Sequence, residues 1–227
     1  MLFRSRAEGI DRLDTLLLTH GDAHHVGGAG FIGRQFPPAT VVRSPVAFRS
    51  PAYREAIKQF SSRTNLLQTV NRGEVINGWE VLHPEATDHF PQADDKAIVL
   101  RADLRGTRVL LLSDLGKPGQ NALLEREPDL RAEIVVSGIP TQTQPLADSL
   151  LDTIQPRLIV ISDSIYPATA RASRNLRERL AARNIPVIFT SEQGALTICF
   201  KKDSWEVRSA SGRVLEPRIP HKTEDSN

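Results

Sequence analysis

Residues 15–28 read TLLLTHGDAHHVGG, an apolar run of strand length that ends in a cluster of histidine and aspartate. Three of the six histidines in the chain fall within this stretch. In an extended segment, residues i and i+2 point the same way, so His20 and Asp22 can converge on one point, while His24 and His25 open the following helix. Imidazole and carboxylate groups together suit zinc or a similar borderline ion. The alternative from the residues alone is a polar loop whose histidines cap the helix and bond neighbouring carbonyls.

The composition is that of an ordinary globular domain. The chain has 227 residues, 40% of them hydrophobic and 25% charged, which is enough for one sizeable core. Its longest apolar runs, at residues 108–113 and 157–162, are far shorter than the roughly 20 residues of a membrane-spanning helix, so no span is expected in this chain. The basic N-terminus precedes no apolar segment and does not resemble a signal peptide. The formal net charge of +2 leaves the partner open.

Short β-branched runs alternate with amphipathic stretches of helical length, which predicts an α/β fold in which helices cover a sheet. We expect strands at residues 15–19, 40–43, 66–70, 79–82, 97–102, 108–113, 134–136, 158–162, 186–190, 196–200 and 205–209. We expect helices at residues 24–34, 50–62, 118–126, 144–153 and 168–184. Asn77-Gly78 predicts a hairpin turn. The domain is expected to span residues 1–212, and the polar residues 213–227 are expected to form a loose, disordered tail.

The histidine cluster is part of a longer resemblance. Residues 9–28 read GIDRLDTLLLTHGDAHHVGG, and the later segments are GWEVLHP, DKAIVLR, LLLSD, PRLIVIS and PVIFTSEQGAL. In order and spacing they resemble the metallo-β-lactamase domain at the C-terminal end of ComEC-type DNA-uptake proteins, whose signature reads H-x-D-x-D-H-x-G-G. The resemblance covers residues 5–200 and implies a metallo-β-lactamase-type αββα sandwich that lacks its first N-terminal strands.

The resemblance also assigns residues to a metal site. His20, Asp22 and His25 match metal ligands of the family, and Asp114 matches the carboxylate that bridges or anchors the metals. His24 stands where the family has aspartate, so it remains a candidate ligand but brings no negative charge. If the domain is active, Asp22 and Asp114 are the catalytic carboxylates, and the reaction is the metal-dependent hydrolysis of a phosphodiester or another ester.

Two further segments of the family's site lack their histidines in this chain. Residues 137–141 read SGIPT where the family has His-His-Gly-Ser, and residues 163–169 read DSIYPAT where the family has Gly-His-Pro. Two neighbouring metals need about six or more protein ligands, which is more than the candidates named above supply. His83 and His89 are expected to be structural. We therefore expect at most one zinc or manganese ion, or none.

Family members begin with two hairpin strands, and this chain begins after them. We expect the N-terminal sheet to have an unpaired edge in consequence. The chain is then either a piece of a longer membrane protein of DNA uptake or a degenerate domain. It would be cytoplasmic if it is the whole protein, and otherwise the soluble domain of a membrane-anchored DNA-uptake protein.

Arginines on the predicted helix at residues 168–184 give a weak hint of DNA as a partner. A solvated helix face explains them better than phosphate binding does, because they do not form a single stripe at 3.6 residues per turn. They are Arg171, Arg174, Arg177, Arg179 and Arg183.

Three functions remain open at this point. We rank first a degraded or weakly active metallo-hydrolase-fold domain of the DNA-uptake lineage. The second is an active one-metal phosphodiesterase or nuclease, and the third is a non-catalytic module that binds nucleic acid or protein.

We predict that the side chains of His20, Asp22, His25 and Asp114 lie together at one edge of a sheet, although Asp114 is distant in sequence. Both segments end apolar strands, and site loops in layered α/β folds collect at strand ends. A structure that places Asp114 at the opposite edge from His20 would contradict the resemblance.

Overall fold

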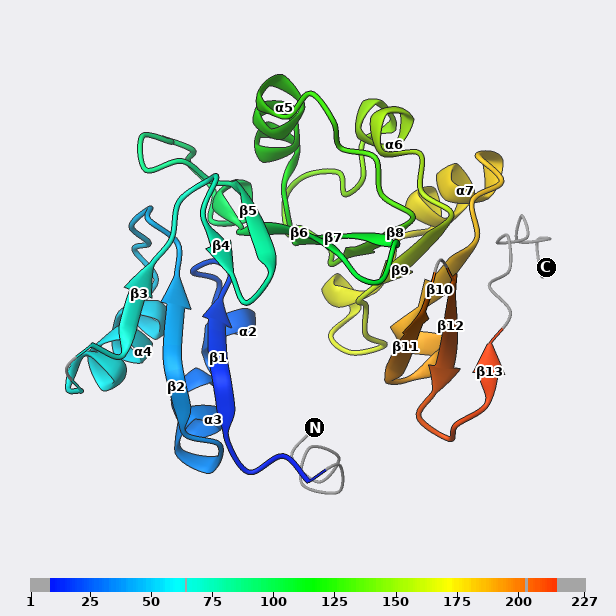
Figure 1. Ribbon diagram of the computed structural model, residues 1–227. Coiled ribbons are helices and arrows are strands. Elements are labelled where there is room, and N and C mark those ends of the chain that lie inside the picture. The colour runs from blue at the N-terminus through cyan, green and yellow to red at the C-terminus, as the bar shows by residue number, and fades with distance from the viewer. Residues whose placement is uncertain (1–8, 64, 203, 216–227) are drawn as a thin grey trace.

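The computed structural model describes residues 9–63, 65–202 and 204–215, and its centre is a seven-stranded mixed sheet (Figure 1). In order across this sheet the strands are β10 (Val187–Phe189), β9 (Leu158–Ile161), β8 (Ile134–Ser137), β7 (Arg108–Ser113), β6 (Val99–Asp103), β5 (Trp79–His83) and β4 (Val75–Ile76). Strands β4 to β7 pair antiparallel, whereas β7 to β10 pair parallel. The parallel half needs crossover connections, and each of them contains a helix.

These crossover helices cover one face of the sheet. They are α5 (Lys117–Arg126), α6 (Asp148–Ile154) and α7 (Arg174–Ala182), which follow β7, β8 and β9 in the chain. Leu123, Leu151 and Leu180, one from each helix, belong to the same buried apolar cluster as Leu110 and Ile159 of the strands. The helices therefore form one outer layer, at the top of Figure 1.

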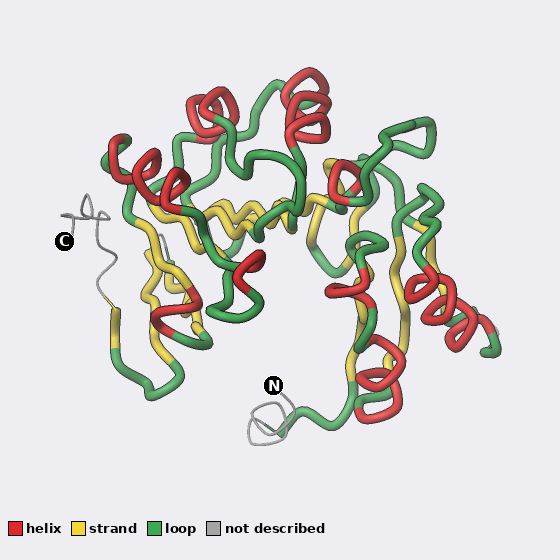
Figure 2. Tube along the Cα trace, turned by 180° about the vertical axis from the view of Figure 1, so that it is seen from behind, coloured by secondary structure: helices red, strands yellow, loops and turns green. Residues whose placement is uncertain are grey.

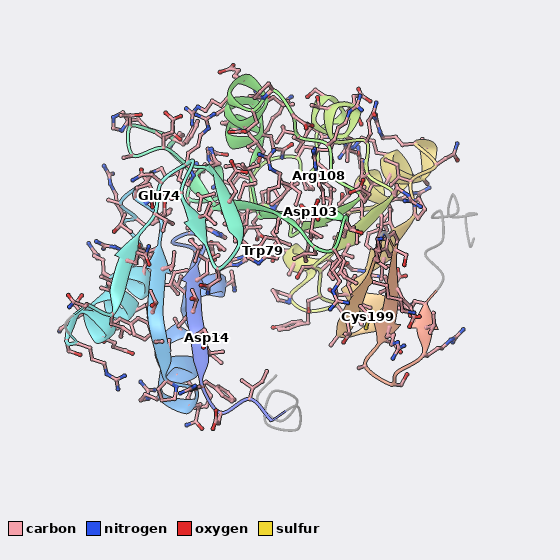
Figure 3. All side chains as sticks on the ribbon, in the orientation of Figure 1. Asp14, Glu74, Trp79, Asp103, Arg108 and Cys199 are labelled. Atoms are coloured by element: carbon pink, nitrogen blue, oxygen red, sulfur yellow. The ribbon has the colours of Figure 1, made fainter. Side chains whose placement is uncertain are left out.

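Two three-stranded sheets lie against the opposite face. The first is parallel and consists of β1 (Leu13–Leu18), β2 (Pro38–Arg43) and β3 (Leu67–Thr69). The second is antiparallel and consists of β11 (Leu196–Lys201), β12 (Ser204–Ser209) and β13 (Val214–Leu215). Each packs on the central sheet through its own buried cluster, and Trp79, labelled in Figure 3, contacts both clusters.

A last layer of helices covers the outside of the parallel β1–β3 sheet, as seen from behind in Figure 2. These helices are α2 (Ala23–Val26), α3 (Ala29–Gln35) and α4 (Pro51–Ser61). Val26, Ala29 and Phe60 from the helices join Leu18 and Val41 from the strands in one buried cluster. The order of layers is helix, sheet, sheet, helix, which agrees with the αββα sandwich expected from the sequence.

The expected unpaired edge is present on β1. Within the described residues β1 pairs only with β2, so its other edge has no strand partner. Leu16 and Leu17 on this strand are only partly buried. None of the helices in the described ranges is long and apolar enough to cross a membrane.

Three of the predicted helices are shorter than expected. The helix expected at residues 24–34 is broken into α2 and α3 at Gly27 and Gly28, since glycine has the lowest helix propensity after proline. The helix expected at residues 144–153 begins only at Asp148, because Leu146 adopts a φ of 50°, outside the helical range. The helix expected at residues 168–184 starts with a separate 3-10 turn, and α7 follows Ser173, whose hydroxyl caps it.

The C-terminal segment differs from the expected loose tail at its start. Val214–Leu215 form β13 and pair with β12, and Leu215 packs against the buried cluster between this sheet and the central sheet. Residues 216–227 lie outside the described residues, so the tail and the domain boundary at residue 212 stay predictions beyond this point.

We predict that Leu110→Ala lowers the free energy of unfolding by about 2–5 kcal/mol, because it removes buried methyl groups and leaves a cavity. Leu110 is fully buried on β7, the central strand of the sheet. The control is Val75→Thr on β4, where the side chain is 64% exposed, and it should change stability by less than about 0.5 kcal/mol. Urea unfolding followed by circular dichroism measures both, and equal effects would contradict this placement of the core.

Candidate metal centre

The ends of β1 and β7 are joined by hydrogen bonds, and this junction positions the site. The backbone N–H of Ile98 donates to the carbonyl of Thr19 at 2.9 Å, just past the end of β1. The Ser113 hydroxyl, at the end of β7, donates to the Thr19 hydroxyl at 3.2 Å. The backbone N–H of Gly138, after β8, donates to the Ser113 carbonyl at 2.8 Å. Three strand ends therefore meet where the histidine cluster begins.

His20, His25 and Asp114 converge at this junction. One ligand atom from each side chain lies within 4.8 Å of those of the other two. His25 Nε2 is 2.8 Å from Asp114 Oδ2, and the centroids of the two imidazole rings are 4.2 Å apart. The predicted approach of Asp114 to the histidines is therefore found.

His20 is fully buried and is held in the form that binds metals. Its Nδ1 lies 3.0 Å from the Thr19 hydroxyl, and its buried Nε2 has no hydrogen-bond partner in the described structure. Burial, together with the nearby His25, lowers the pKa of His20 to about 4. The ring is therefore neutral at pH 7, as a metal ligand must be.

His25 is in the opposite electrostatic situation. Burial by itself lowers its pKa, but the hydrogen bond to Asp114 and the charges of Asp114, Asp22 and Asp94 outweigh burial and raise the pKa of His25 above its ordinary value. In the metal-free protein the proton is thus held between His25 and Asp114. A metal ion that binds both groups has to displace this proton, so binding is expected to weaken at low pH.

Asp22 and His24 lie beside the cluster without joining it. The Asp22 carboxylate caps α2, because its Oδ1 accepts a hydrogen bond from the backbone N–H of His24 at 2.7 Å. His24 is exposed, and both residues line the same cavity as His25 and Asp114. The alternative expected the histidines to cap the helix, whereas the capping side chain is Asp22. The roles of Asp22 and His24 toward a metal stay predictions.

A cavity of about 280 Å³ opens beside His25 and Asp114. Its wall includes the two segments that lack the family's histidines. The lining residues are Asp22, His24, His25, Asp114, Ile139, Thr141, Ser162, Ser164, Tyr166, Pro167, Thr169 and Ala170. The two segments are therefore in place at the site, but they contribute hydroxyl and apolar groups instead of imidazoles.

Gly138 leaves room for the Asp114 carboxylate. A Cβ atom at this position would lie 1.8 Å from Asp114 Oδ1, which is far inside van der Waals contact. Any other residue at position 138 would have to displace Asp114. This constraint was not evident in the sequence, where SGIPT was notable only for the missing histidines.

One more acidic residue faces the cluster and was not among the sequence candidates. Asp94, on the 3-10 turn η1 (Asp94–Lys96) before β6, places its Oδ1 3.6 Å from His20 Nε2. The segment that carries the resemblance in this region begins at Asp95, and no sequence motif includes Asp94. Only the position of Asp94 in the folded structure identifies it as part of the site.

The other two histidines of the described residues lie away from the cavity. His83 is buried, and its Nε2 lies 2.8 Å from the carbonyl oxygen of Asp95. A protonated Nε2 can donate a hydrogen bond to this carbonyl. His89 is exposed in the loop between β5 and β6. Neither residue lines the cavity.

The arginines of α7 and its flanks are largely engaged within the protein. Arg177 pairs with Asp163 and Glu192. Its guanidinium carbon lies 3.7 Å from the centroid of the Phe189 ring. Arg179 pairs with Asp148, and Arg183 pairs with the same carboxylate. These contacts hold α7 against its neighbours. They make it less plausible that the arginines form a phosphate-binding surface.

Comparison with known proteins agrees with this geometry. A sequence profile described as the metallo-beta-lactamase superfamily matches residues 1–192. ComE operon protein 3 of Bacillus subtilis (strain 168) is 25% identical over 200 residues, which make up 86% of this chain and 26% of that protein. Competence protein ComA of Neisseria gonorrhoeae is 23% identical over 191 residues, which make up 84% of this chain and 26% of that protein. The chain thus matches only a minor share of the length of either relative.

We predict that Asp114→Asn lowers the pKa of His25 in the metal-free protein, because the hydrogen-bonded charge is lost while the burial remains. In the wild type the folded pKa is raised, so the pair stabilises the fold below the ordinary histidine pKa and this stabilisation is lost as the pH rises through the folded value. An NMR titration of the His25 ring in EDTA measures the shift. Asp22→Asn removes a charge that raises the pKa of His25 less than Asp114 does, so it should lower that pKa less. An unchanged pKa of His25 in Asp114→Asn would contradict the pairing.

Proposed function

Because this chain belongs to the metallo-beta-lactamase superfamily, we propose that its strand-end site binds a single divalent metal ion and supports little or no hydrolysis. The domain is related to competence proteins. In this proposal it is a degraded or weakly active form of a metal-dependent hydrolase fold from the DNA-uptake lineage.

The proposal is carried by the convergence of His20, His25 and Asp114. Two imidazoles and one carboxylate form a donor set that suits zinc or manganese, and the unpartnered Nε2 of buried His20 is a polar atom that a metal ion would satisfy. Among the described residues this is the one group of three or more such side chains within reach of a common ion. A second ion would need imidazoles from residues 137–141 or 163–169, which have none.

The surrounding residues hold the ligands in place. When His20 carries its proton on Nδ1, it donates to the Thr19 hydroxyl and leaves the Nε2 lone pair free for the ion. Asp114 Oδ2 lies 2.8 Å from His25 Nε2 and orients the imidazole, and both groups could hold a metal ion once the proton between them was lost. A bound divalent ion would lower the pKa of a coordinated water toward about 7 and polarise an ester oxygen. Asp22, engaged as a helix cap, is then a weak candidate for the general base.

The second candidate, an active one-metal phosphodiesterase, is favoured by the hydroxyl groups of the cavity. Thr141, Ser162, Ser164 and Thr169 line it and could donate hydrogen bonds to phosphate oxygens. We rank this function lower, because the donors around the metal are too few to hold both a nucleophile and a substrate in line. DNA is a proposed partner only through the lineage, since the arginines of α7 are paired within the fold.

The cellular setting is also a proposal. The relatives are several times longer than this chain, and the matched part is 26% of each. We propose that the domain acts as part of, or beside, a membrane-anchored DNA-uptake protein.

We predict that the purified protein binds at most one zinc or manganese ion per chain, weakly, and cleaves neither DNA nor a generic phosphodiester at an appreciable rate. The reason is that loss of first-shell imidazoles both loosens the metal and removes the groups that orient water and substrate. Elemental analysis after gel filtration and a plasmid-nicking assay with added metal provide the measurements.

His20→Ala and His24→Asp are the informative variants of this experiment. His20→Ala should abolish metal binding, whereas His24→Asp, which returns the family's carboxylate, should not restore cleavage. Two tightly held metals per chain, together with cleavage that is lost in His20→Ala, would overturn the proposal in favour of the active enzyme.

A further inference from the structure

Asp94 is held beside the candidate metal site by a segment in which this chain lacks the family's histidines. Its Oδ2 accepts hydrogen bonds from both the backbone N–H and the hydroxyl of Thr141, each at 2.8 Å. Thr141 belongs to residues 137–141, where the family's histidines are missing, and it also lines the cavity. This segment therefore orients a carboxylate toward the site instead of supplying an imidazole.

The other oxygen of Asp94 faces His20. Asp94 Oδ1 lies 3.6 Å from His20 Nε2, which is too far for a hydrogen bond, and Nε2 has no other partner in the described structure. Both side chains are nearly or completely buried, at 7% and 0% exposure. When the proton of neutral His20 is on Nδ1, its Nε2 and Asp94 Oδ1 are two acceptor atoms that face each other at this distance and are well placed to share a cation. Two ligands of one tetrahedral zinc ion, each about 2.1 Å from it, lie roughly 3.4 Å apart.

Charge supports the same conclusion. His20 and His25 are uncharged when they bind a metal, so the three-residue group offers a divalent ion only the single negative charge of Asp114. A buried ion with an uncompensated charge is costly, and a second carboxylate within reach removes that cost. Asp22 is already engaged by the N-terminus of α2 through its Oδ1.

We propose that Asp94 is a fourth ligand of the metal site, binding through Oδ1 next to His20 and held in orientation by Thr141. This inference rests on the proposed metal-binding function. It replaces the family's imidazoles with a carboxylate from a different segment of the chain, the turn before β6. Asp94 lies outside the group formed by His20, His25 and Asp114, so an ion bound by all four side chains would require Asp94 to approach the other three.

The test compares zinc affinity and the visible spectrum of the cobalt-loaded protein among the wild type, Asp94→Asn and Asp95→Asn. Asp94→Asn retains an oxygen that can accept from Thr141 but loses the charge, and we expect zinc binding to weaken at least about tenfold, with a changed cobalt spectrum. Asp95→Asn is the matched control, because Asp95 is an adjacent buried carboxylate that lies against Gly116 at the start of α5. It should bind zinc within about twofold of the wild type.

The outcomes separate this inference from the proposed function. If the wild type binds no metal, the proposed function fails and the inference fails with it. If the wild type binds one ion and Asp94→Asn matches it in affinity and spectrum, only the inference is overturned. Thermal unfolding in EDTA checks that the variants fold. If Asp94→Asn does not fold, Thr141→Val tests the inference instead. Loss of the hydroxyl that orients Asp94 should weaken zinc binding, and unchanged zinc binding would overturn the inference.

Discussion

The whole site depends on Thr19, the residue at which the parallel β1–β3 sheet is joined to the central sheet. Its carbonyl accepts from Ile98 at the start of β6, and its hydroxyl accepts from Ser113 at the end of β7. The same hydroxyl lies 3.0 Å from Nδ1 of His20. One residue therefore sets both the junction of the two sheets and the orientation of the first ligand. Because the junction is partly buried, its hydrogen bonds are costly to leave unmade, which keeps the strand ends together.

The two histidines of the cluster are tuned in opposite directions by their surroundings. Burial holds His20 neutral with a pKa of about 4, whereas Asp114 keeps a proton on His25 by a hydrogen bond and by its charge. The first ligand is thus ready for a metal ion, while the second must exchange a proton for it. This asymmetry is a physical reason to expect weak, pH-dependent binding, independent of the number of ligands.

The changes in the segments around the cavity fit together sterically and electrostatically. Gly138 has no side chain where one would collide with Asp114, and Thr141 holds Asp94. The side chain of Asp163, in the second altered segment, is buried, accepts from Ser191 and pairs with Arg177. It thus anchors its loop to α7 and to α8 (Thr190–Gln193), the short helix that follows β10. The altered segments are therefore well integrated into the fold, although they no longer present imidazoles.

The sequence by itself determined the layered α/β fold, most of the strand positions and three members of the cluster. The strands could be predicted because their periodicity is a local property of the sequence. His20 and His25 could be predicted because they are close in sequence, and Asp114 because the resemblance to the family assigns a site carboxylate to its position. Tertiary structure alone decided which donors converge, since that depends on where strands end in space. It showed Asp22 engaged as a helix cap, the arginines of α7 paired with carboxylates, and Asp94 facing His20 across 3.6 Å. No periodicity or motif records the contacts of Asp94 and of the α7 arginines, because each of them joins segments that are far apart in the sequence and that only tertiary packing brings together.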